Sequence, residues 1–408
     1  MSKIRIKNFG PIKEGYTEGD GFMDIKKVTV FIGNQGSGKS TVAKLISTFK
    51  WMEKAINRGD ISLFHFHKYA IQNYLAYHRI KNYFGDNTLI EYVGEYVSIK
   101  YSNENNPPEV EFRKDEKYRV PKIMYVPSER NFLSAIENVN NIKRLPGSLF
   151  TFAEELRNGQ NEFKDKEISL PVSDVIYRYE EENDSSYLIG KDYKVNLLEA
   201  SSGYQSLVPL FLVSKFLTDE LSKGGKILRE QLSVEQSIRR NEEIARIMLD
   251  EQLSDEEKSK KVAEIDARYL NVCFINIVEE PEQNLYPDSQ QHILYSLLEF
   301  VNLNEGNKLI MTTHSPYIIN YLTLAIKADS LKKQLKTDKQ KTKLNGVVPL
   351  ISTVNSNDLV IYELDEKDGT IKKLGDYKGL PSDENYLNEK LGESNELFAQ
   401  LLEIEQSL

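Results

Sequence analysis

The 408-residue sequence has one cysteine, no long apolar run and no excess of basic residues. Cys273 alone cannot form an internal disulfide, which is typical of a chain in a reducing compartment. Because Cys273 lies in the apolar run 272–275, we expect a core thiol. No run reaches the roughly 18 apolar residues of a membrane-spanning helix, and residues 1–7 alternate like a strand, not like a signal peptide. The expected location is the cytoplasm, with no membrane partner.

The charge balance limits the classes of partner. There are 53 Lys and Arg against 62 Asp and Glu, which gives a formal net charge of −9 and disfavours general attraction to nucleic acids or anionic membranes. The local exception is a run with lysines at 332, 333, 336, 339, 341 and 343. It indicates a solvated face, a linker or a nucleic-acid contact. A chain of 408 residues is longer than a typical domain with one simple core, so we expect either one large domain with insertions or two domains.

The stretch 33–41 organises the rest of the sequence. It fits G-x-x-x-x-G-K-[ST], follows the apolar β-branched run 28–32 and precedes a helical pattern from residue 42, as a phosphate-binding P-loop does. Glycines let consecutive N–H groups point at one phosphate, and the helix N-terminus favours negative charge. Lys39 is expected to reach the β- and γ-phosphates of ATP, and the Ser40 hydroxyl to ligate Mg²⁺. The residues predicted to hold the nucleotide are Gly33, Asn34, Gly36, Ser37, Gly38, Lys39, Ser40 and Thr41.

Two further apolar strands end in residues that fit phosphate chemistry. The run 274–278 ends in Glu279 and Glu280, and acids in that place are costly unless they serve a cation. We expect Glu279 to hold Mg²⁺ through water and Glu280 to polarise the attacking water. The strand predicted at 308–313 ends in His314, which we expect to contact the γ-phosphate or the attacking water. The predicted catalytic residues are thus Lys39, Glu280 and His314.

Two other segments carry weaker signals. Residues 201–206, with the sequence S-S-G-Y-Q-S, precede an apolar helix and form either a second anion site or an ordinary helix cap. Ser128, Glu129 and Arg130 follow the strand predicted at 122–126, where ligands of α/β sheets lie. They either sense the γ-phosphate or cap the next helix, and the sequence does not decide between these alternatives.

The remaining segments predict accessory elements. Residues 60–83 have a helical pattern, 88–113 alternate like an antiparallel hairpin, and 360–374 and 386–402 predict a C-terminal hairpin and helix. Residues 221–269 are highly charged with sparse apolar positions, which predicts two helices in a projecting hairpin. That arm is either solvated or a docking site for a partner.

The P-loop, the 201–206 segment, and the E-E-P-E and T-T-H-S-P strand ends together resemble the ABC-class ATPases. In that class two heads dimerise head to tail, and the signature motif of one caps the ATP of the other. Ser202, Gly203 and Gln205 match signature positions, while Tyr204 stands where a second glycine is usual. Glu279 stands where the usual aspartate holds Mg²⁺, and His314 matches the switch histidine. The resemblance therefore implies a homo-oligomer that contains at least a head-to-tail dimer.

The motif E-E-P-E-x-N-L-Y-P is similar to that of the OLD branch of ABC-class ATPases, which is close to SMC and RecF-type heads. A head of this kind with a helical arm resembles the ATPase subunit of the PARIS antiphage system, whose partner is a separate Toprim nuclease. Asp365, Glu366 and Asp368 fall in a hairpin turn, so no nuclease activity is expected in this chain.

The resemblance implies an α/β, ABC-type P-loop ATPase head with a mixed sheet, flanking helices, an antiparallel β subdomain and a helical-hairpin or coiled-coil insertion. The expected divisions are 1–220 for the first lobe, 221–269 for the insertion, 270–330 for the second lobe, and 331–408 for a basic linker, hairpin and helix.

Two functions are consistent with these expectations. One is an ATP-dependent sensor or switch in antiphage defence, which controls a separate Toprim-type nuclease in response to a viral trigger. The other is a DNA-repair ATPase of the RecF or SMC kind that binds DNA across a head dimer. An importer subunit fits less well because the insertions are long.

Overall fold

The computed structural model describes residues 1–63, 66, 68–103, 107–113, 118–136, 144–223 and 232–406. Within these ranges the centre is a seven-stranded sheet in the order β2-β16-β15-β4-β14-β13-β8. The strands β15, β4, β14, β13 and β8 are parallel, and β16 is antiparallel to β15. The predicted mixed α/β sheet is confirmed. Its strands are β2 (Gly15–Tyr16), β4 (Val28–Gly33), β8 (Pro121–Val126), β13 (Cys273–Glu279), β14 (Lys308–Thr312), β15 (Leu359–Leu364) and β16 (Thr370–Lys373).

The central strands are buried because the sheet is covered on both faces. Every residue of β4 and of β13 is buried, as expected for parallel strands between two layers. Successive side chains point to opposite faces, so Val28, Val30 and Ile32 join one hydrophobic cluster and Phe31 joins the other.

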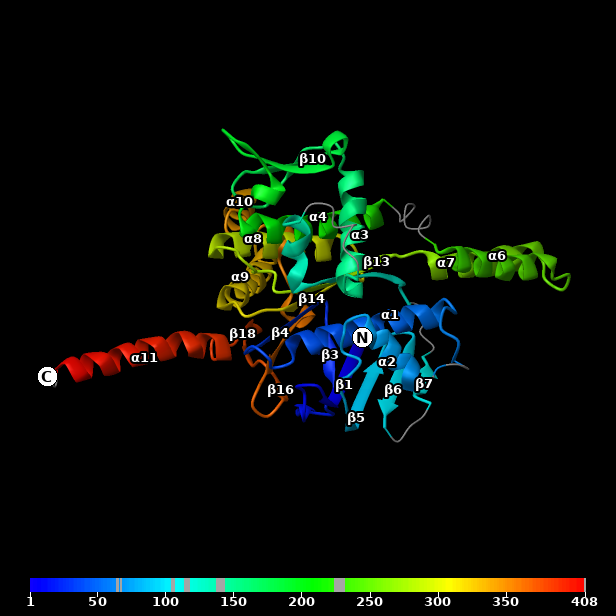
Figure 1. Cartoon of the computed structure of the whole chain (residues 1–408), viewed down its shortest axis with the longest axis horizontal. Helices are drawn as coiled ribbons and strands as arrows, with labels where there is room; N and C mark the ends of the chain where they lie inside the picture. The colour runs from blue at the N-terminus through cyan, green and yellow to red at the C-terminus, as the bar shows by residue number, and fades with distance from the viewer. Residues whose placement is uncertain are drawn as a thin grey trace.

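One face packs against an α/β layer (Figure 1). It contains α1 (Lys39–Asn57), α2 (Lys68–Ala76) and an antiparallel sheet in the order β3-β1-β5-β6-β7. Helix α2 is shorter than the helical pattern of 60–83; residues 64, 65 and 67 lie outside the described ranges. The strands of this antiparallel sheet are β1 (Ser2–Phe9), β3 (Met23–Ile25), β5 (Phe84–Val93), β6 (Val97–Ser102) and β7 (Glu109–Phe112).

The other face is covered mainly by helices. They are α3 (Gly147–Glu162), α4 (Ser202–Ser222), α8 (Pro287–Leu303) and α9 (Pro316–Lys332). A small antiparallel sheet in the order β12-β11-β10-β9 lies beyond α3 and α4. Its strands are β9 (Ile168–Ser169), β10 (Ile176–Glu180), β11 (Ser185–Ile189) and β12 (Lys194–Asn196).

Two helical elements project from the body in different directions (Figure 1). One is the pair α6 (Val234–Leu249) and α7 (Asp255–Tyr269), each started by a capping box, at Ser233 and Ser254. This pair lies within 221–269, where two helices in a projecting hairpin were predicted; residues 221–222 belong to α4, and residues 224–231 lie outside the described ranges. The other is α11 (Tyr386–Gln406), which follows the short strands β17 (Asp376–Tyr377) and β18 (Leu380–Pro381). A further helix, α10 (Asp338–Asn345), lies beside α9. No helix in the described ranges is long and apolar enough to cross a bilayer.

Candidate functional site

The predicted site segments meet at one edge of the central sheet. The P-loop follows β4, the paired acids end β13, His314 follows β14, and Ser128 follows β8. These strands are parallel neighbours, so their carboxyl ends lie at the same edge, where α/β proteins bind ligands. The pairing register fixes the alignment: Glu279 pairs with Thr312, and Thr312 pairs with Phe31.

The P-loop depends on glycine at three positions. Gly33, Gly36 and Gly38 have φ values of 143°, 81° and 102°, which L-residues with a Cβ rarely adopt. A Cβ on Gly33 would also lie 2.3 Å from the Leu364 carbonyl oxygen of the neighbouring strand. Helix α1 begins directly after Gly38, so its free N–H groups and dipole face the loop. This is the geometry of an anion site.

Lys39 folds back over the loop that precedes it. Its buried ammonium donates hydrogen bonds to the carbonyl oxygens of Gly33, at 2.9 Å, and Asn34, at 2.8 Å. Burial lowers the pKa of Lys39 to about 8, while the charges of Glu280 and Glu282 act in the opposite direction. The side chain is a mostly charged donor at neutral pH whose present partners are backbone oxygens of the loop itself.

The two oxygens of the Glu279 carboxylate differ, because one of them accepts a hydrogen bond and the other does not. Its Oε2 accepts a hydrogen bond of 3.3 Å from the backbone N–H of Ser128. Its buried Oε1 makes no hydrogen bond within the described residues, but it pairs with the ammonium of Lys44 at 4.0 Å. Burial and the Glu279 carboxylate together raise the pKa of the neighbouring Tyr125 hydroxyl. A buried carboxylate oxygen without a partner is costly unless a cation or water satisfies it.

The donor set at this edge fits Mg²⁺. The described residues hold no cluster of three or more His, Cys, Asp or Glu side chains that could bind a metal. Mg²⁺ at phosphate sites needs few protein ligands, because waters and the phosphates supply most of its coordination. The Ser40 hydroxyl and the Glu279 oxygen that makes no hydrogen bond are hard oxygen donors of the required kind.

Glu280 and His314 lie together at the exposed side of this edge. Glu280 has a φ of 45°, and its backbone N–H donates to the Thr312 carbonyl at 2.9 Å. His314 Nε2 lies 3.4 Å from Glu280 Oε1, and this contact lowers the pKa of the Glu280 carboxyl. Both side chains are more than a third exposed. Glu280 is therefore an ionised carboxylate open to solvent, as a group that polarises water must be.

The role of Arg130 could not be decided from the sequence. The side chain is fully buried, and it donates to the carbonyl oxygens of Glu279 (2.7 Å), Glu280 (2.6 Å), Ser206 (3.0 Å) and Pro127 (3.3 Å). Burial lowers its pKa to about 10. Arg130 thus ties the ends of β8 and β13 to the start of α4, and its donors are turned to the backbone instead of to a phosphate.

Glu282 is a second positioning residue that sequence reasoning missed. Its buried carboxylate accepts hydrogen bonds from the Thr313 hydroxyl (2.8 Å) and the His314 backbone N–H (2.7 Å). Burial raises the pKa of Glu282. It fixes the loop that carries His314. The only signal in the sequence was a third acid in E-E-P-E, and nothing local distinguished it from the other two.

The residues matched to the signature motif lie at the N-terminus of α4. Ser202 is exposed, whereas Gln205 donates its amide to the Leu198 carbonyl at 2.9 Å. A Cβ on Gly203 would lie 2.9 Å from the Asn284 carbonyl oxygen. In the described part of the chain, no hydrogen bond or ion pair joins Ser202, Gly203 or Gln205 to the P-loop.

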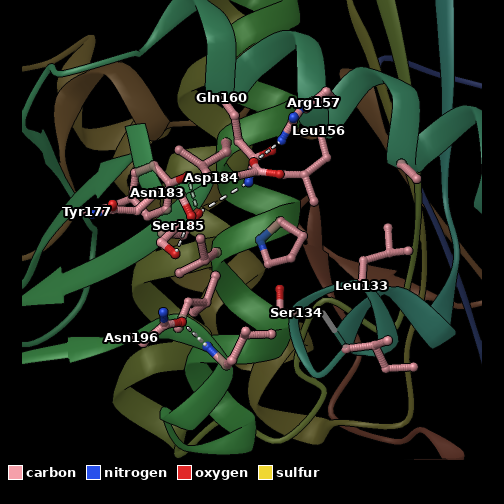
Figure 2. A pocket seen from close by; sticks show the side chains of 18 residues that line it. Leu133, Ser134, Leu156, Arg157, Gln160, Tyr177, Asn183, Asp184, Ser185 and Asn196 are labelled. Carbon is pink, nitrogen blue, oxygen red and sulfur yellow. Dashed lines mark hydrogen bonds and ion pairs between the residues drawn. The ribbon is translucent and has the colours of Figure 1, made fainter. Parts of the chain in front are cut away.

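One described cavity away from this edge has a volume of about 410 Å³ (Figure 2). It lies between α3, the β10–β12 sheet and α4, and none of the predicted site residues lines it. Its polar groups are satisfied by one another: Arg157 pairs with Asp184, and the Tyr177 hydroxyl lies 2.9 Å from that of Ser186.

Comparisons with known proteins agree with a nucleotide site. A family model described as an AAA ATPase domain (AAA_15) matches residues 135–319, a range that includes α4, both acids and His314. No curated protein matches the sequence. Together with the P-loop, the family match supports an ATPase.

Solved structures similar to this chain have low identity. One is the SMC head domain from Thermotoga maritima, with 11% identity, a TM-score of 0.40, and coverage of 92% of this chain and 98% of that one. Another is an Smc head from Pyrococcus furiosus with an extended coiled coil, bound to the C-terminal domain of ScpA, with 11% identity, a TM-score of 0.36, and coverage of 92% and 96%. A third is a dimeric ATP-binding cassette, MJ0796, bound to ADP and phosphate, with 13% identity, a TM-score of 0.27, and coverage of 92% and 100%. Likeness at this level carries no inference about activity.

Proposed function

We propose that this chain binds Mg·ATP at the carboxyl edge of its central sheet and hydrolyses it as an ABC-class ATPase. The observation that carries the proposal is the buried Glu279 oxygen that makes no hydrogen bond within the described residues, at the same edge as Lys39 and the glycine-dependent loop. A carboxylate with an oxygen that makes no hydrogen bond, a buried ammonium and a helix N-terminus are complementary to a cation and a polyphosphate.

Each residue has a role that its surroundings support. Lys39 exchanges its two loop carbonyls for the β- and γ-phosphate oxygens. Ser40 and Glu279 hold Mg²⁺, which when bound neutralises charge on the phosphates. Glu280 accepts the proton of the attacking water, and His314 beside it contacts the γ-phosphate or that water. Arg130 and Glu282 position these groups without touching substrate.

A second copy of the chain completes the site in this proposal. Ser202, Gly203 and Gln205 at the start of α4 would present N–H groups and hydroxyls to the γ-phosphate held by the partner. Their lack of described contacts with their own P-loop supports a role in trans. The oligomer would be at least a head-to-tail dimer sandwiching ATP.

At the cellular level we propose an ATP-dependent sensor or switch in antiphage defence. Two features support this proposal because they resemble AriA of the PARIS system. One is the motif E-E-P-E-x-N-L-Y-P, and the other is the layout of a head with a helical arm at 234–269. A separate Toprim-type nuclease would be the effector, and a viral protein the trigger.

A second candidate is a RecF- or SMC-like ATPase that binds DNA across the head dimer. The observation that favours it is the set of exposed lysines between residues 332 and 343. DNA-stimulated ATP hydrolysis that falls steeply with salt would support this candidate. Copurification with the product of a neighbouring Toprim gene, insensitive to nuclease treatment, would support the first.

The test of the catalytic proposal compares Glu280→Gln with Lys39→Ala. Glu280→Gln keeps the shape but not the base, so we expect ATP binding to persist while phosphate release slows by about 100-fold or more. Lys39→Ala removes the phosphate donor, so binding and hydrolysis should both be lost. Glu305→Gln, on the exposed surface, is the matched control and should behave as wild type. Undiminished hydrolysis by Glu280→Gln, or normal ATP binding by Lys39→Ala, would contradict the proposal.

A further inference from the structure

In the part of the chain that the structure describes, the hydrogen bonds from α11 to preceding segments lie in its first turn. The backbone N–H of Tyr386 donates to the Glu363 carboxylate at 2.8 Å, and Leu387 is buried. The rest of the helix projects away from the body (Figure 1). Its distal half nevertheless carries large apolar side chains with exposed fractions of 41–62%: Leu397, Phe398, Leu401, Leu402 and Ile404.

These side chains form one face. Leu397, Leu401 and Ile404 recur at i, i+4 and i+7, and Phe398 and Leu402 lie beside them at i and i+4. Most of the stability of such a helix comes from packing its apolar face against another surface. An exposed apolar face of this size marks an interaction site.

The charge of α11 restricts what can cover it. Residues 391–406 contain Glu393, Glu396, Glu403 and Glu405 and no lysine or arginine. Pairing with the α11 of another copy would place like charges side by side, which is unfavourable. The complementary surface must combine apolar side chains with positive charge.

This chain carries such a surface at the junction of α8, α9, α10 and the short 3₁₀ turn Leu350–Ser352. We call it the lysine surface. Lys332 donates to the Leu350 carbonyl at 2.8 Å, and Asn302 donates to the Ile351 carbonyl at 2.6 Å, which holds these elements together. Its exposed side chains are the apolar Leu303, Leu331, Val347 and Ile351 and the basic Lys332, Lys333, Lys336, Lys339, Lys341 and Lys343.

The balance of charge on the lysine surface is strongly positive. Residues 331–347 contain these lysines and a single acid, Asp338. Lys341 pairs with Asp338 at 3.1 Å, and Lys333 pairs with Asp329 at 2.7 Å. Because the chain as a whole has a formal net charge of −9, a basic surface of this size is a local exception.

We propose that α11 of one copy docks on the lysine surface of a second copy. Within one chain α11 points away from α10 (Figure 1), so the contact is made in trans. Donor and acceptor surfaces differ, so the contact is heterologous and closes a ring or extends a filament. It is separate from the ATP-sandwiched dimer proposed above and does not depend on it.

The test uses the full-length chain with Lys39→Ala, so that assembly through ATP is absent. Analytical ultracentrifugation should show concentration-dependent association above the monomer mass that weakens with salt. Phe398→Ser with Leu401→Ser removes apolar anchors and should weaken association about tenfold or more. Glu396→Lys with Glu403→Lys, or Lys339→Glu with Lys343→Glu, should weaken it similarly. Mixing these two charge-reversed chains should restore it.

Two controls keep the outcome specific. Lys260→Glu with Lys261→Glu, exposed on α7, changes the charge equally and should not affect association. Because Cys273 is buried, cysteines can be placed at 398 and 347. A Phe398→Cys chain mixed with a Val347→Cys chain should form a mixed disulfide dimer. A monomer at every concentration, crosslinks only between two 398 positions, or lysine reversals that alter DNA binding but not mass would each overturn the proposal.

Discussion

At the scale of single residues, Lys39 links the structure of the site to pH. Its pKa of about 8 reflects burial, and phosphate oxygens would stabilise the charged form. The ATP-bound state therefore holds a proton that the free state loses above pH 8, so affinity must fall as pH rises. We expect Mg·ATP affinity to drop about tenfold between pH 7 and pH 9, measured by titration calorimetry.

The matched control is Lys39→Arg, whose guanidinium stays charged throughout this range. Its affinity should be lower than that of wild type but independent of pH from 7 to 9. A wild-type affinity that is constant over the range would show that Lys39 is not the titrating group. A parallel fall in the Arg variant would lead to the same conclusion.

The sequence predicted some residues of the site and not others, for a physical reason. Lys39 and Ser40 sit at fixed offsets in a loop, and Glu279, Glu280 and His314 follow recognisable buried strands. Arg130 could not be assigned, because three of its four carbonyl partners lie 76 to 150 residues away in the chain. A side chain whose partners are backbone atoms of other segments leaves no local pattern.

At the scale of elements, a change at the start of α4 can distinguish a nucleotide site formed by one chain from a site completed by a second chain. Ser202 is exposed at this N-terminus, and the Gln205 amide donates to the Leu198 carbonyl. A Cβ on Gly203 would meet the Asn284 carbonyl oxygen. A bulky cation here would block approach of a partner's nucleotide without disturbing the chain's own P-loop. We expect Ser202→Arg to bind Mg·ATP with wild-type affinity and to lose most of its hydrolysis.

The measurement combines nucleotide titration with phosphate release at several protein concentrations. Wild-type turnover per chain should rise with protein concentration, because each site needs a partner, whereas that of Ser202→Arg should stay low and flat. Ser259→Arg, at an exposed position on α7, is a matched control. Full hydrolysis by Ser202→Arg would argue that the signature match is not functional in trans.

Elements were predictable where one physical signal dominated. The buried strands β4, β8, β13 and β14 stand out as continuous apolar runs that end in polar residues. The length of helix α2 was overestimated, because the aromatic residues of 60–83 fit a helical period as well as they fit packing in turns. Arg79, with a φ of 59°, lies in the turn that follows this helix. Strand order was not predictable, because β15 lies beside β4 although more than 300 residues separate them.

At the scale of the whole molecule, one sheet separates two hydrophobic clusters. Phe49 of α1 belongs to the cluster on the side of the antiparallel sheet, and Leu298 of α8 belongs to the cluster on the helical side. The strand β4 contributes residues to both clusters, so unfolding of either cluster would remove the packing of β4 on that face. This coupling predicts that the two clusters unfold together.

The only tryptophan, Trp51, lies on α1 and reports on the Phe49 side alone. We expect Leu298→Ala, on the opposite face, to shift the urea transition of Trp51 fluorescence to lower urea as much as it shifts that of far-UV circular dichroism. The loss should be about 2–5 kcal/mol, with a similar loss for Phe49→Ala. Leu249→Ala, exposed on α6, should change stability by less than about 0.5 kcal/mol. A Trp51 transition that ignores Leu298→Ala would mean that the two faces unfold independently, and that β4 does not transmit packing between them.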